Sequence, residues 1–176
     1  PAPAAIFQAE LRRRFPSAHT AAMDPRTPED QASKILTNAS DADVVVCATL
    51  VRVISGKGSV ALPENQRRVI DMLLARQKPM LWLAFGNPYV LRNYPQAQGA
   101  MCTFSYADVS QIAAAKALSG EIEINGKMPV SIPGYSKVGD GIRLERLDLT
   151  LKSASPDAMG LSKDAFRETE KLLASY

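Results

Sequence analysis

Residues 43–50 of this chain read Asp-Val-Val-Val-Cys-Ala-Thr-Leu, and this stretch decides the class of fold. No charged residue interrupts the run that follows Asp43. Such an unbroken apolar run predicts a strand that is covered on both faces, as the strands of parallel sheets are. Two further buried strands are predicted at residues 79–85 and 99–104, and a short strand at residues 18–23.

Helix signals alternate with these strands. Residues 6–15 predict a first helix, and Thr27 is predicted to cap a second one that has Pro28 at its first helical position. Pro63 is predicted to open a third helix. The apolar residues of this helix recur at helical spacing and are expected to be buried: Val69, Ile70, Leu73 and Leu74.

A fourth helix is predicted after the strand at residues 99–104. Ser105 and Asp108 have the spacing of a capping box, and Gly120 supplies a stop after Leu118. Strands and helices therefore alternate along the chain. This order predicts an α/β fold with a mostly parallel sheet and helices on both faces, a three-layer α/β/α arrangement.

Size and composition narrow the possible functions. A chain of 176 residues can form one domain with a sizeable core and a tail. A (β/α)₈ barrel needs about 250 residues, so we expect no barrel in this chain. The net charge of +3 gives no argument for nucleic-acid binding. The longest apolar runs are too short to span a membrane, and because Pro1 is not a native start, the compartment is left open.

No cofactor or metal site is expected from the residue types. Cys47 and Cys102 lie in apolar strand patterns and are predicted to be buried free thiols. Together with the single histidine, His19, they do not form a convincing zinc site. The sequence also lacks the motifs of serine hydrolases, zinc proteases and P-loop enzymes.

The turn formed by Gly86, Asn87 and Pro88 is the main candidate site. It follows a predicted parallel strand, and open α/β sheets bind ligands beyond the carboxyl ends of their strands. The alternative is structural: Asn87 caps a short helix and Pro88 takes the first position of that helix. We favour the cap, and we expect Asn87 and Tyr89 to contact a substrate or a neighbouring domain from the same loop.

Three other features are weaker candidate sites. Residues 52–62 contain Gly56-Lys57-Gly58-Ser59, which imitates a dinucleotide fingerprint, but the next helix begins too late for it, so a flexible loop is the better interpretation. Glu121 and Glu123 could be offered as a pair of catalytic carboxylates, but two charges in a turn-rich segment are usually just solvated. His19 is expected to be a structural or surface histidine.

Several short runs, taken in order, resemble one known family. The runs are Asp43-Val44-Val45-Val46, Leu62-Pro63 with Gln66, Phe85-Gly86-Asn87-Pro88-Tyr89, Gly120-Glu121, Gly126-Lys127-Met128-Pro129-Val130-Ser131-Ile132-Pro133, and Val138-Gly139-Asp140-Gly141. In this order they resemble the carboxy-terminal α/β domain of glycoside hydrolase family 3, above all the β-N-acetylglucosaminidase type. The resemblance covers residues 6–142.

This resemblance implies a partner and a division of labour. In the N-acetylglucosaminidase-like members the catalytic residues lie on an N-terminal (β/α)₈ barrel domain. Other branches of the family place an acid/base glutamate on the second domain, but no motif assigns this role to a particular glutamate here, so the resemblance implies no catalytic residue in this chain. It also implies that an amino-sugar glycoside would be bound through the parent protein. The chain starts just after the position of the first strand of the family's domain, so a truncated or rearranged sheet is expected.

The chain is predicted to divide at two places. Residues 1–141 form the α/β domain in this interpretation, and residues 142–160 form a linker or edge strand because their apolar alternation slips between Leu144 and Leu147. Residues 161–176 are predicted to form a last helix. This tail weakly resembles the start of a penicillin-binding-protein-like serine hydrolase domain, and a simple terminal helix is nearly as good an interpretation.

Two hypotheses of different classes follow. The first is a non-catalytic C-terminal domain of a family 3 β-N-acetylglucosaminidase-like enzyme, which supports the barrel and the rim of its active site. The alternative is a stand-alone module that binds a small ligand or a nucleotide through residues 52–62 and the turn at residues 86–88.

Overall fold

The computed structural model describes residues 4–51, 62–150, 153–162, 164 and 166–175. At its centre lie three parallel strands in the order β1 (Val45–Val51), β2 (Met80–Gly86) and β3 (Gly99–Cys102). Strand β2 is the middle strand: Val45 lies opposite Met80 on one side, and Leu81 lies opposite Gly99 on the other. The prediction of a parallel sheet is confirmed, and the apolar run from Val45 onward forms its first strand.

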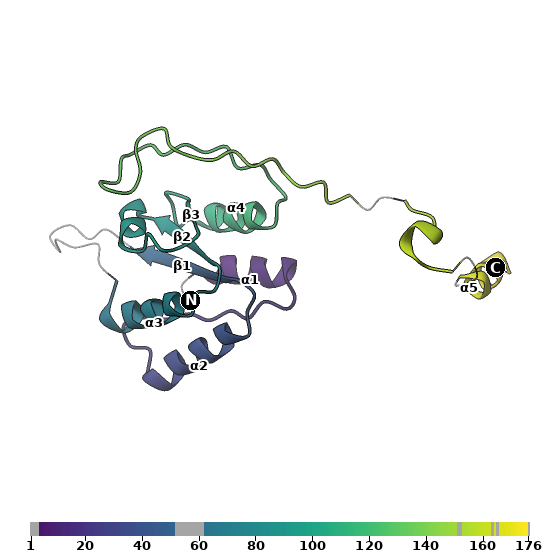
Figure 1. Ribbon diagram of the computed structural model, residues 1–176, viewed down its shortest axis with the longest axis horizontal. Helices are drawn as coiled ribbons and strands as arrows, with labels where there is room; N and C mark the ends of the chain where they lie inside the picture. The colour runs from purple at the N-terminus through teal and green to yellow at the C-terminus, as the bar shows by residue number, and fades with distance from the viewer. Residues whose placement is uncertain (1–3, 52–61, 151–152, 163, 165, 176) are drawn as a thin grey trace.

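Helices cover both faces of this sheet (Figure 1). Helices α2 (Glu29–Ser40) and α3 (Glu64–Ala75) lie on one face, and α1 (Ala5–Arg14) and α4 (Asp108–Leu118) lie on the other. The predicted helices at residues 6–15 and after Pro63 are confirmed. Val69, Ile70 and Leu73 are buried as expected, whereas Leu74 is only half-buried. Because a pair of helices covers each face of the sheet, the fold has the predicted three-layer α/β/α arrangement.

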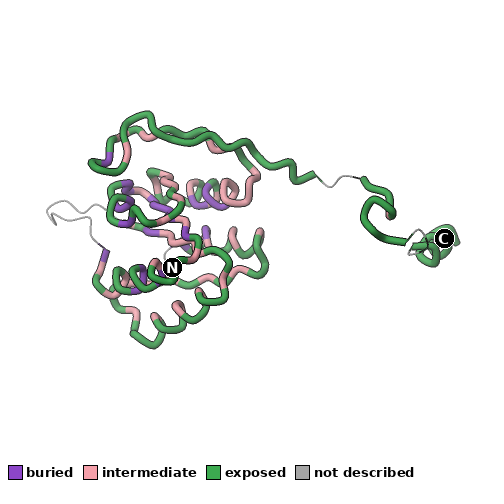
Figure 2. The backbone as a smooth tube through the Cα atoms, viewed as in Figure 1, coloured by how far each residue is buried: buried purple, intermediate pink, exposed green. Residues whose placement is uncertain are grey.

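Strand β2 explains why the core has two halves. Its side chains alternate between the faces, so Met80, Trp82 and Ala84 pack toward α2 and α3 while Leu83 and Phe85 pack toward α1 and α4. The ring of Trp82 stacks on Tyr94 with centroids 4.2 Å apart, and Phe7 meets Phe85 edge-on at 5.3 Å. Figure 2 shows the buried residues gathered along the strands and the inner sides of the helices.

Two predicted helix starts differ from the structure. Helix α2 begins at Glu29 with Pro28 as its cap, because the Thr27 hydroxyl is engaged by Asp24 and does not reach the helix. Helix α4 begins at Asp108, because Ser105 accepts from the Ala107 N–H in a tight turn before the helix. The stop at Gly120 is confirmed by its left-handed backbone, φ +74°.

A long hairpin, called the arm below (residues 120–147), follows α4. Its two sides meet through backbone bonds between Ile124 and Leu144 and between Leu147 and Gly120, without a regular strand. Near the tip, Ile132 is buried against the core beside Val90. The apolar alternation after Ile142 therefore belongs to an extended segment that is exposed along its length.

The described residues after the arm include two short helices. They are the 3₁₀ helix η2 (Asp157–Met159) and the helix α5 (Arg167–Ala174), and all side chains described for α5 are exposed. Figure 1 shows α5 well apart from the sheet. Within the described residues, no helix is long and apolar enough to cross a membrane.

Candidate functional site at the carboxyl edge of the sheet

The three parallel strands end at one edge of the sheet, where open α/β folds bind ligands. Three loops leave this edge. The loop after β1 (residues 52–61) carries the fingerprint-like glycines and lies outside the described residues. The other two loops, after β2 and after β3, define the candidate site.

Asn87 holds the loop after β2 in place. Its side-chain oxygen accepts a hydrogen bond from the Tyr89 N–H at 2.9 Å, and it caps the 3₁₀ helix η1 (Pro88–Asn93) with Pro88 at the first position. The Asn87 side chain is buried, with 5% of the residue exposed. The structural role predicted for this residue is confirmed, and the cap fixes where Tyr89 begins its turn.

Tyr89 is one of three exposed aromatic residues at this edge. It is 38% exposed, and Phe104 and Tyr106 in the loop after β3 are 40% and 49% exposed. Phe104 has a left-handed backbone, φ +53°, which is uncommon for a bulky residue and occurs mostly in turns and at functional sites. We call these three residues the edge aromatics.

The two loops contact each other through a glycine. Gly86, the last residue of β2, has φ +86°, and a Cβ atom at this position would lie 3.2 Å from Cδ1 of Tyr106. The loop after β3 is fixed by local bonds: the Thr103 hydroxyl donates to the Ser105 carbonyl at 2.5 Å, and the Phe104 N–H donates to Cys102 Sγ at 3.4 Å. Sequence reasoning missed Phe104 and Tyr106, because the predicted strand at residues 99–104 included Phe104, whereas β3 ends at Cys102.

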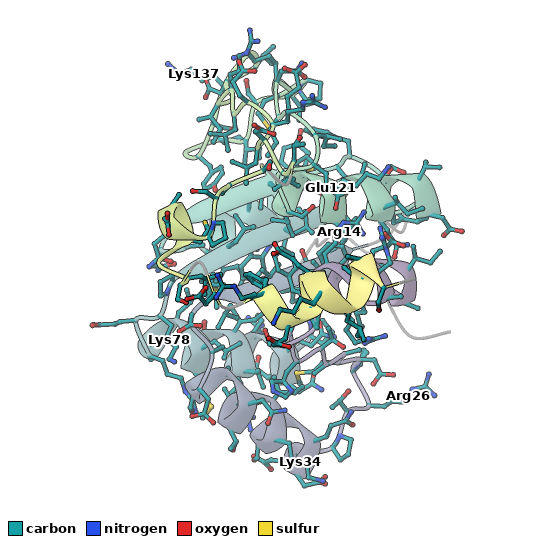
Figure 3. All side chains as sticks on the ribbon, turned by 90° about the vertical axis from the view of Figure 1, so that its right-hand side faces the viewer. Arg14, Arg26, Lys34, Lys78, Glu121 and Lys137 are labelled. Carbon is teal, nitrogen blue, oxygen red and sulfur yellow. The ribbon has the colours of Figure 1, made fainter. Side chains whose placement is uncertain are left out.

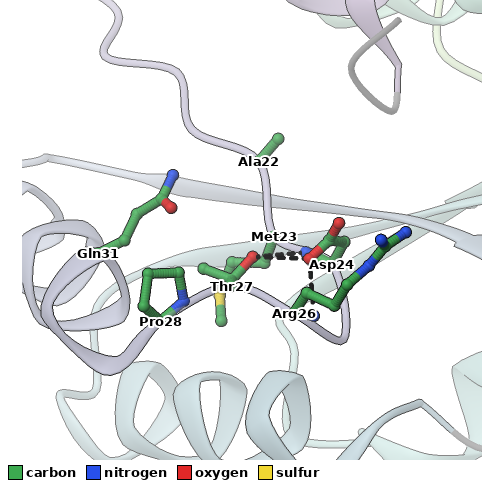
Figure 4. A pocket seen from close by; sticks show the side chains of 7 residues that line it. All are labelled: Ala22, Met23, Asp24, Arg26, Thr27, Pro28 and Gln31. Carbon is green, nitrogen blue, oxygen red and sulfur yellow. Dashed lines mark hydrogen bonds between the residues drawn. The ribbon is translucent and has the colours of Figure 1, made fainter.

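A shallow hollow of about 540 Å³ lies at the start of α2 (Figure 4). Its polar groups bind one another, since Asp24 accepts from the Arg26 N–H at 2.8 Å and from the Thr27 hydroxyl at 3.3 Å. Asn65 and Gln66 of α3 donate to the backbone of the same turn. These bonds attach the turn to α3, so the hollow has a structural explanation.

Glu121 does not take part in the candidate site. It follows the last turn of α4, at the opposite edge of the sheet, and receives two bonds from Arg14, from Nε at 2.5 Å and from Nη2 at 3.1 Å. Arg14 also pairs with Glu10, and its side chain is only 4% exposed. Figure 3 shows Arg14 and Glu121 facing each other between α1 and α4.

The bonds from Arg14 lower the pKa of the Glu10 and Glu121 carboxyl groups. For Glu121 the main cause is the Arg14 guanidinium, followed by the Ser119 hydroxyl. For Glu10 the causes are the bonds from Arg14 and then Arg13. Glu123 instead lies 3.8 Å from Arg143 on the exposed arm. Glu121 and Glu123 are therefore not arranged as a catalytic pair.

The thiols are unsuited to nucleophilic chemistry. Burial raises the pKa of Cys47 to about 12, and burial also raises the pKa of Cys102. Both are free cysteines, as predicted. His19 lies exposed between α1 and α2. The described part of the chain holds no cluster of three side chains that could bind a metal ion.

Comparison with known proteins gives one matching family. The family model described as "Glycosyl hydrolase family 3 C-terminal domain" matches residues 4–167. A "Periplasmic beta-glucosidase" of Salmonella typhimurium is 30% identical over 118 residues, which is 63% of this chain and 15% of that protein.

A solved structure shares the fold. It is a fungal multi-domain GH3 beta-N-acetylglucosaminidase described with a GCN5-related glucosamine N-acetyltransferase region, and it superposes with a TM-score of 0.59 at 23% identity. The match covers 96% of this chain and 17% of the fungal one. The chain thus spans about a sixth of the length of the relatives that it matches.

Proposed function

Because the chain belongs to the family of glycosyl hydrolase family 3 C-terminal domains, we propose that it works as the non-catalytic second domain of a longer glycosidase. Its partner is a catalytic (β/α)₈ barrel domain of the same parent protein. The glycoside substrate is bound by the parent, and this chain supports the barrel and contributes to the rim of its active site.

The edge aromatics carry this proposal. Tyr89, Phe104 and Tyr106 leave about two-fifths to half of their surfaces open at the edge where α/β folds meet ligands. Aromatic side chains are enriched in the buried centres of protein interfaces, and their rings pack well on other surfaces. An edge of this kind suits contact with a second domain beside an active site.

The chemistry of the described residues supports a non-catalytic role. Glycosidases use two carboxyl groups that flank the scissile bond. The two glutamates considered for this task, Glu121 and Glu123, are paired with arginines away from the edge aromatics. We therefore assign the catalytic carboxyl groups to the parent's barrel domain.

We further propose that the parent acts on β-N-acetylglucosaminides. The ordered motifs between residues 43 and 141 resemble those of that type, and the fungal structure with that activity in its description covers nearly the whole chain. The similarity to a periplasmic β-glucosidase makes β-glucosides the comparison substrate. Aryl glycosides of both sugars, offered to the parent protein, would separate the two classes.

The domain limits belong to the same proposal. Residues 1–141 form the α/β domain, residues 142–160 connect it onward, and residues 161–176 begin the next structural unit. The exposure of every side chain described for α5 supports a partner outside this domain.

The experiment uses the parent protein and this chain side by side. In the parent, Tyr89→Ala should lower kcat/KM on the order of tenfold, equivalent to about 1.4 kcal/mol, because an interface contact beside the active site is lost. Met72→Ala removes a side chain of similar exposure from α3, away from this edge, and serves as the matched control. Equal activity of both variants would contradict the role of the edge aromatics. Turnover by this chain alone, abolished by one substitution within it, would contradict the non-catalytic role.

A further inference from the structure

Gln111 is a polar residue on the buried side of α4. Only 7% of its surface is exposed, and the other two buried residues of this helix are Ala114 and Ala115. Helix α4 packs against α1 on one face of the sheet (Figure 1). A buried amide side chain is costly unless both its oxygen and its nitrogen are hydrogen-bonded. The stability of Gln111 in this contact therefore depends on the bonds that it makes.

Both ends of the Gln111 amide are bonded, and they reach different parts of the chain. Its Oε1 accepts from the Phe7 N–H at 3.1 Å, and its Nε2 donates to the Tyr106 carbonyl at 3.0 Å. An N–H group can only donate and a carbonyl can only accept, so these partners admit one orientation of the amide. Gln111 thus joins the first turn of α1 to the loop that leads from β3 into α4.

The bond to Phe7 caps α1 from a second helix. The first N–H groups of a helix have no acceptor within it, and Ala4, which precedes α1, provides no side-chain cap. The Phe7 ring is itself buried and meets Phe85, the residue before Gly86, at 5.3 Å. One side of the Gln111 amide is therefore attached to a well-packed part of the core.

The bond to Tyr106 holds the end of the loop after β3. The Thr103 N–H attaches the start of this loop to the Ala84 carbonyl of β2 at 3.1 Å. The other hydrogen bonds described above for the loop join residues two positions apart, so they shape the loop without attaching it to the core. A left-handed backbone at a bulky residue such as Phe104 persists only where its surroundings hold it. Gln111 provides such an attachment at the Tyr106 end.

We propose that Gln111 is a positioning residue for the edge aromatics: its amide links the first turn of α1 to the loop after β3, and this link fixes where Phe104 and Tyr106 lie. Because Gln111 is buried, it acts through the loop and not by contact with a partner. The inference rests on the proposed function in one respect, the contact of these rings with the catalytic domain. The alternative is that Gln111 serves only the packing of α1 on α4, in which case the loop keeps its order without it.

The backbone dynamics of this chain test the link directly. Gln111→Met keeps the length of the side chain and removes both bonds. The NMR order parameters of the Phe104 and Tyr106 N–H groups should fall from about 0.85, which is typical of a rigid backbone, to below about 0.6. Unchanged order parameters at these two residues would overturn the proposal.

Gln66→Met is the matched control. Gln66 of α3 also donates its side-chain amide to a backbone carbonyl, that of Met23, at 3.0 Å, but on the other face of the sheet. Met23 ends residues 18–23, where the predicted strand is wrong because these residues pair with no strand of the described sheet. Loss of this bond should leave the order parameters of Phe104 and Tyr106 unchanged. An equal fall in both variants would overturn the proposal, because the loop would then respond to any loss of stability.

A second variant covers the case in which Gln111→Met does not fold. In Gln111→Glu at pH 8, the ionised carboxylate can still accept from the Phe7 N–H, and a negative charge suits the start of a helix. The carboxylate has no proton to donate to the Tyr106 carbonyl. The loop should therefore lose its order while α1 stays helical, and a rigid loop in this variant would overturn the proposal.

The activity of the parent protein tests the functional consequence. Gln111→Met should lower kcat/KM roughly two- to tenfold, the effect of one lost hydrogen bond. In a background that already lacks both rings, Phe104→Ala/Tyr106→Ala, the same substitution should change kcat/KM less than about twofold, because residues that act as a unit are not additive. An equal loss in the two backgrounds would overturn the positioning role. Full activity of Gln111→Met in a parent that needs the two rings would also overturn it.

The positioning role and the proposed function can fail separately. If the parent with Phe104→Ala/Tyr106→Ala keeps full activity while Gln111→Met frees the loop, the proposed contact of these rings with the catalytic domain is wrong. The positioning of the loop by Gln111 would stand in that case, because the order parameters measure it without reference to activity.

Discussion

Gly86 lies close to the ring of Tyr106, where the loops after β2 and β3 meet. Gly86 has φ +86°, and a Cβ atom would come within 3.2 Å of the tyrosine ring. Gly86→Ala should therefore destabilise the protein by about 1–3 kcal/mol, because the backbone is strained and the ring must move. Urea unfolding measures the change. Gly126→Ala is the control, since a Cβ there meets nothing within 4 Å, and equal losses in both variants would contradict the assignment.

The cluster formed by Arg14, Glu10 and Glu121, called the Arg14 cluster, should make the free energy of unfolding depend on pH in the acidic range. The pKa values of Glu10 and Glu121 lie below their ordinary value of 4.5 in the folded protein. The stabilisation they supply is therefore complete above that value and is lost as the pH falls through the lower, folded pKa. The urea midpoint should drop steeply below about pH 4.5.

Removal of the guanidinium tests this dependence. Arg14→Leu should flatten the acid branch of the stability curve and lower stability near neutral pH, because both carboxyl groups lose their main partner. Arg143→Leu removes two surface ion pairs, with Glu123 and Glu145, and should leave the curve close to that of the unmodified protein. An acid branch in Arg14→Leu as steep as in the unmodified protein would show that the cluster does not control it.

Single residues differ in how far sequence reveals their roles. The cap by Asn87 could be predicted because donor and acceptor lie two residues apart. The pair between Arg14 and Glu121 could not, because 107 positions separate them and only the packing of α1 on α4 brings them together. The left-handed backbone of Phe104 had no local signal, since neither glycine nor asparagine marks it.

At the scale of elements, the apolar periodicity of the sequence predicted which helices and strands exist better than it predicted where they begin and end. Strand β2 and helix α3 could be predicted because their apolar residues are the ones that are buried, and β1 and α1 could be predicted from apolar residues at strand or helical spacing. The starts of α2 and α4 were wrong because Thr27 and Ser105 bind neighbouring turns. Residues 18–23 carry a strand pattern, but a strand also needs a partner, which their own sequence does not specify.

The attachment of the arm to the core should depend on one side chain, that of Ile132. Ile132 is 1% exposed in the core beside η1, whereas Ile142 on the same hairpin is 68% exposed. Ile132→Ala should lower the free energy of unfolding by about 2–5 kcal/mol, the usual loss for a buried isoleucine. Ile142→Ala should change it by less than about 0.5 kcal/mol. Urea unfolding compares the two, and similar values for both variants would show that the tip does not anchor the arm.

At the scale of the whole molecule, the compact α/β part and the tail should respond differently to protease. Residues 153–162 are almost entirely exposed and contain little regular structure. Limited trypsin treatment should cut after Lys152 and Lys163, the two trypsin sites that flank this segment, and should spare the helices and strands of the α/β part, because cleavage needs locally open backbone. Mass spectrometry of the fragments gives the cut sites. Equal resistance of both parts would show that the tail belongs to the α/β domain.

The stack of Trp82 on Tyr94 gives the molecule a built-in optical reporter. Trp82 is the only tryptophan in the chain, and it lies at the centre of the middle strand with 1% of its surface exposed. Its fluorescence therefore reports the polarity of one place, the contact between the sheet and the layer of α2 and α3. The emission will shift to longer wavelength when that layer separates from the sheet and will stay constant when only α5 rearranges.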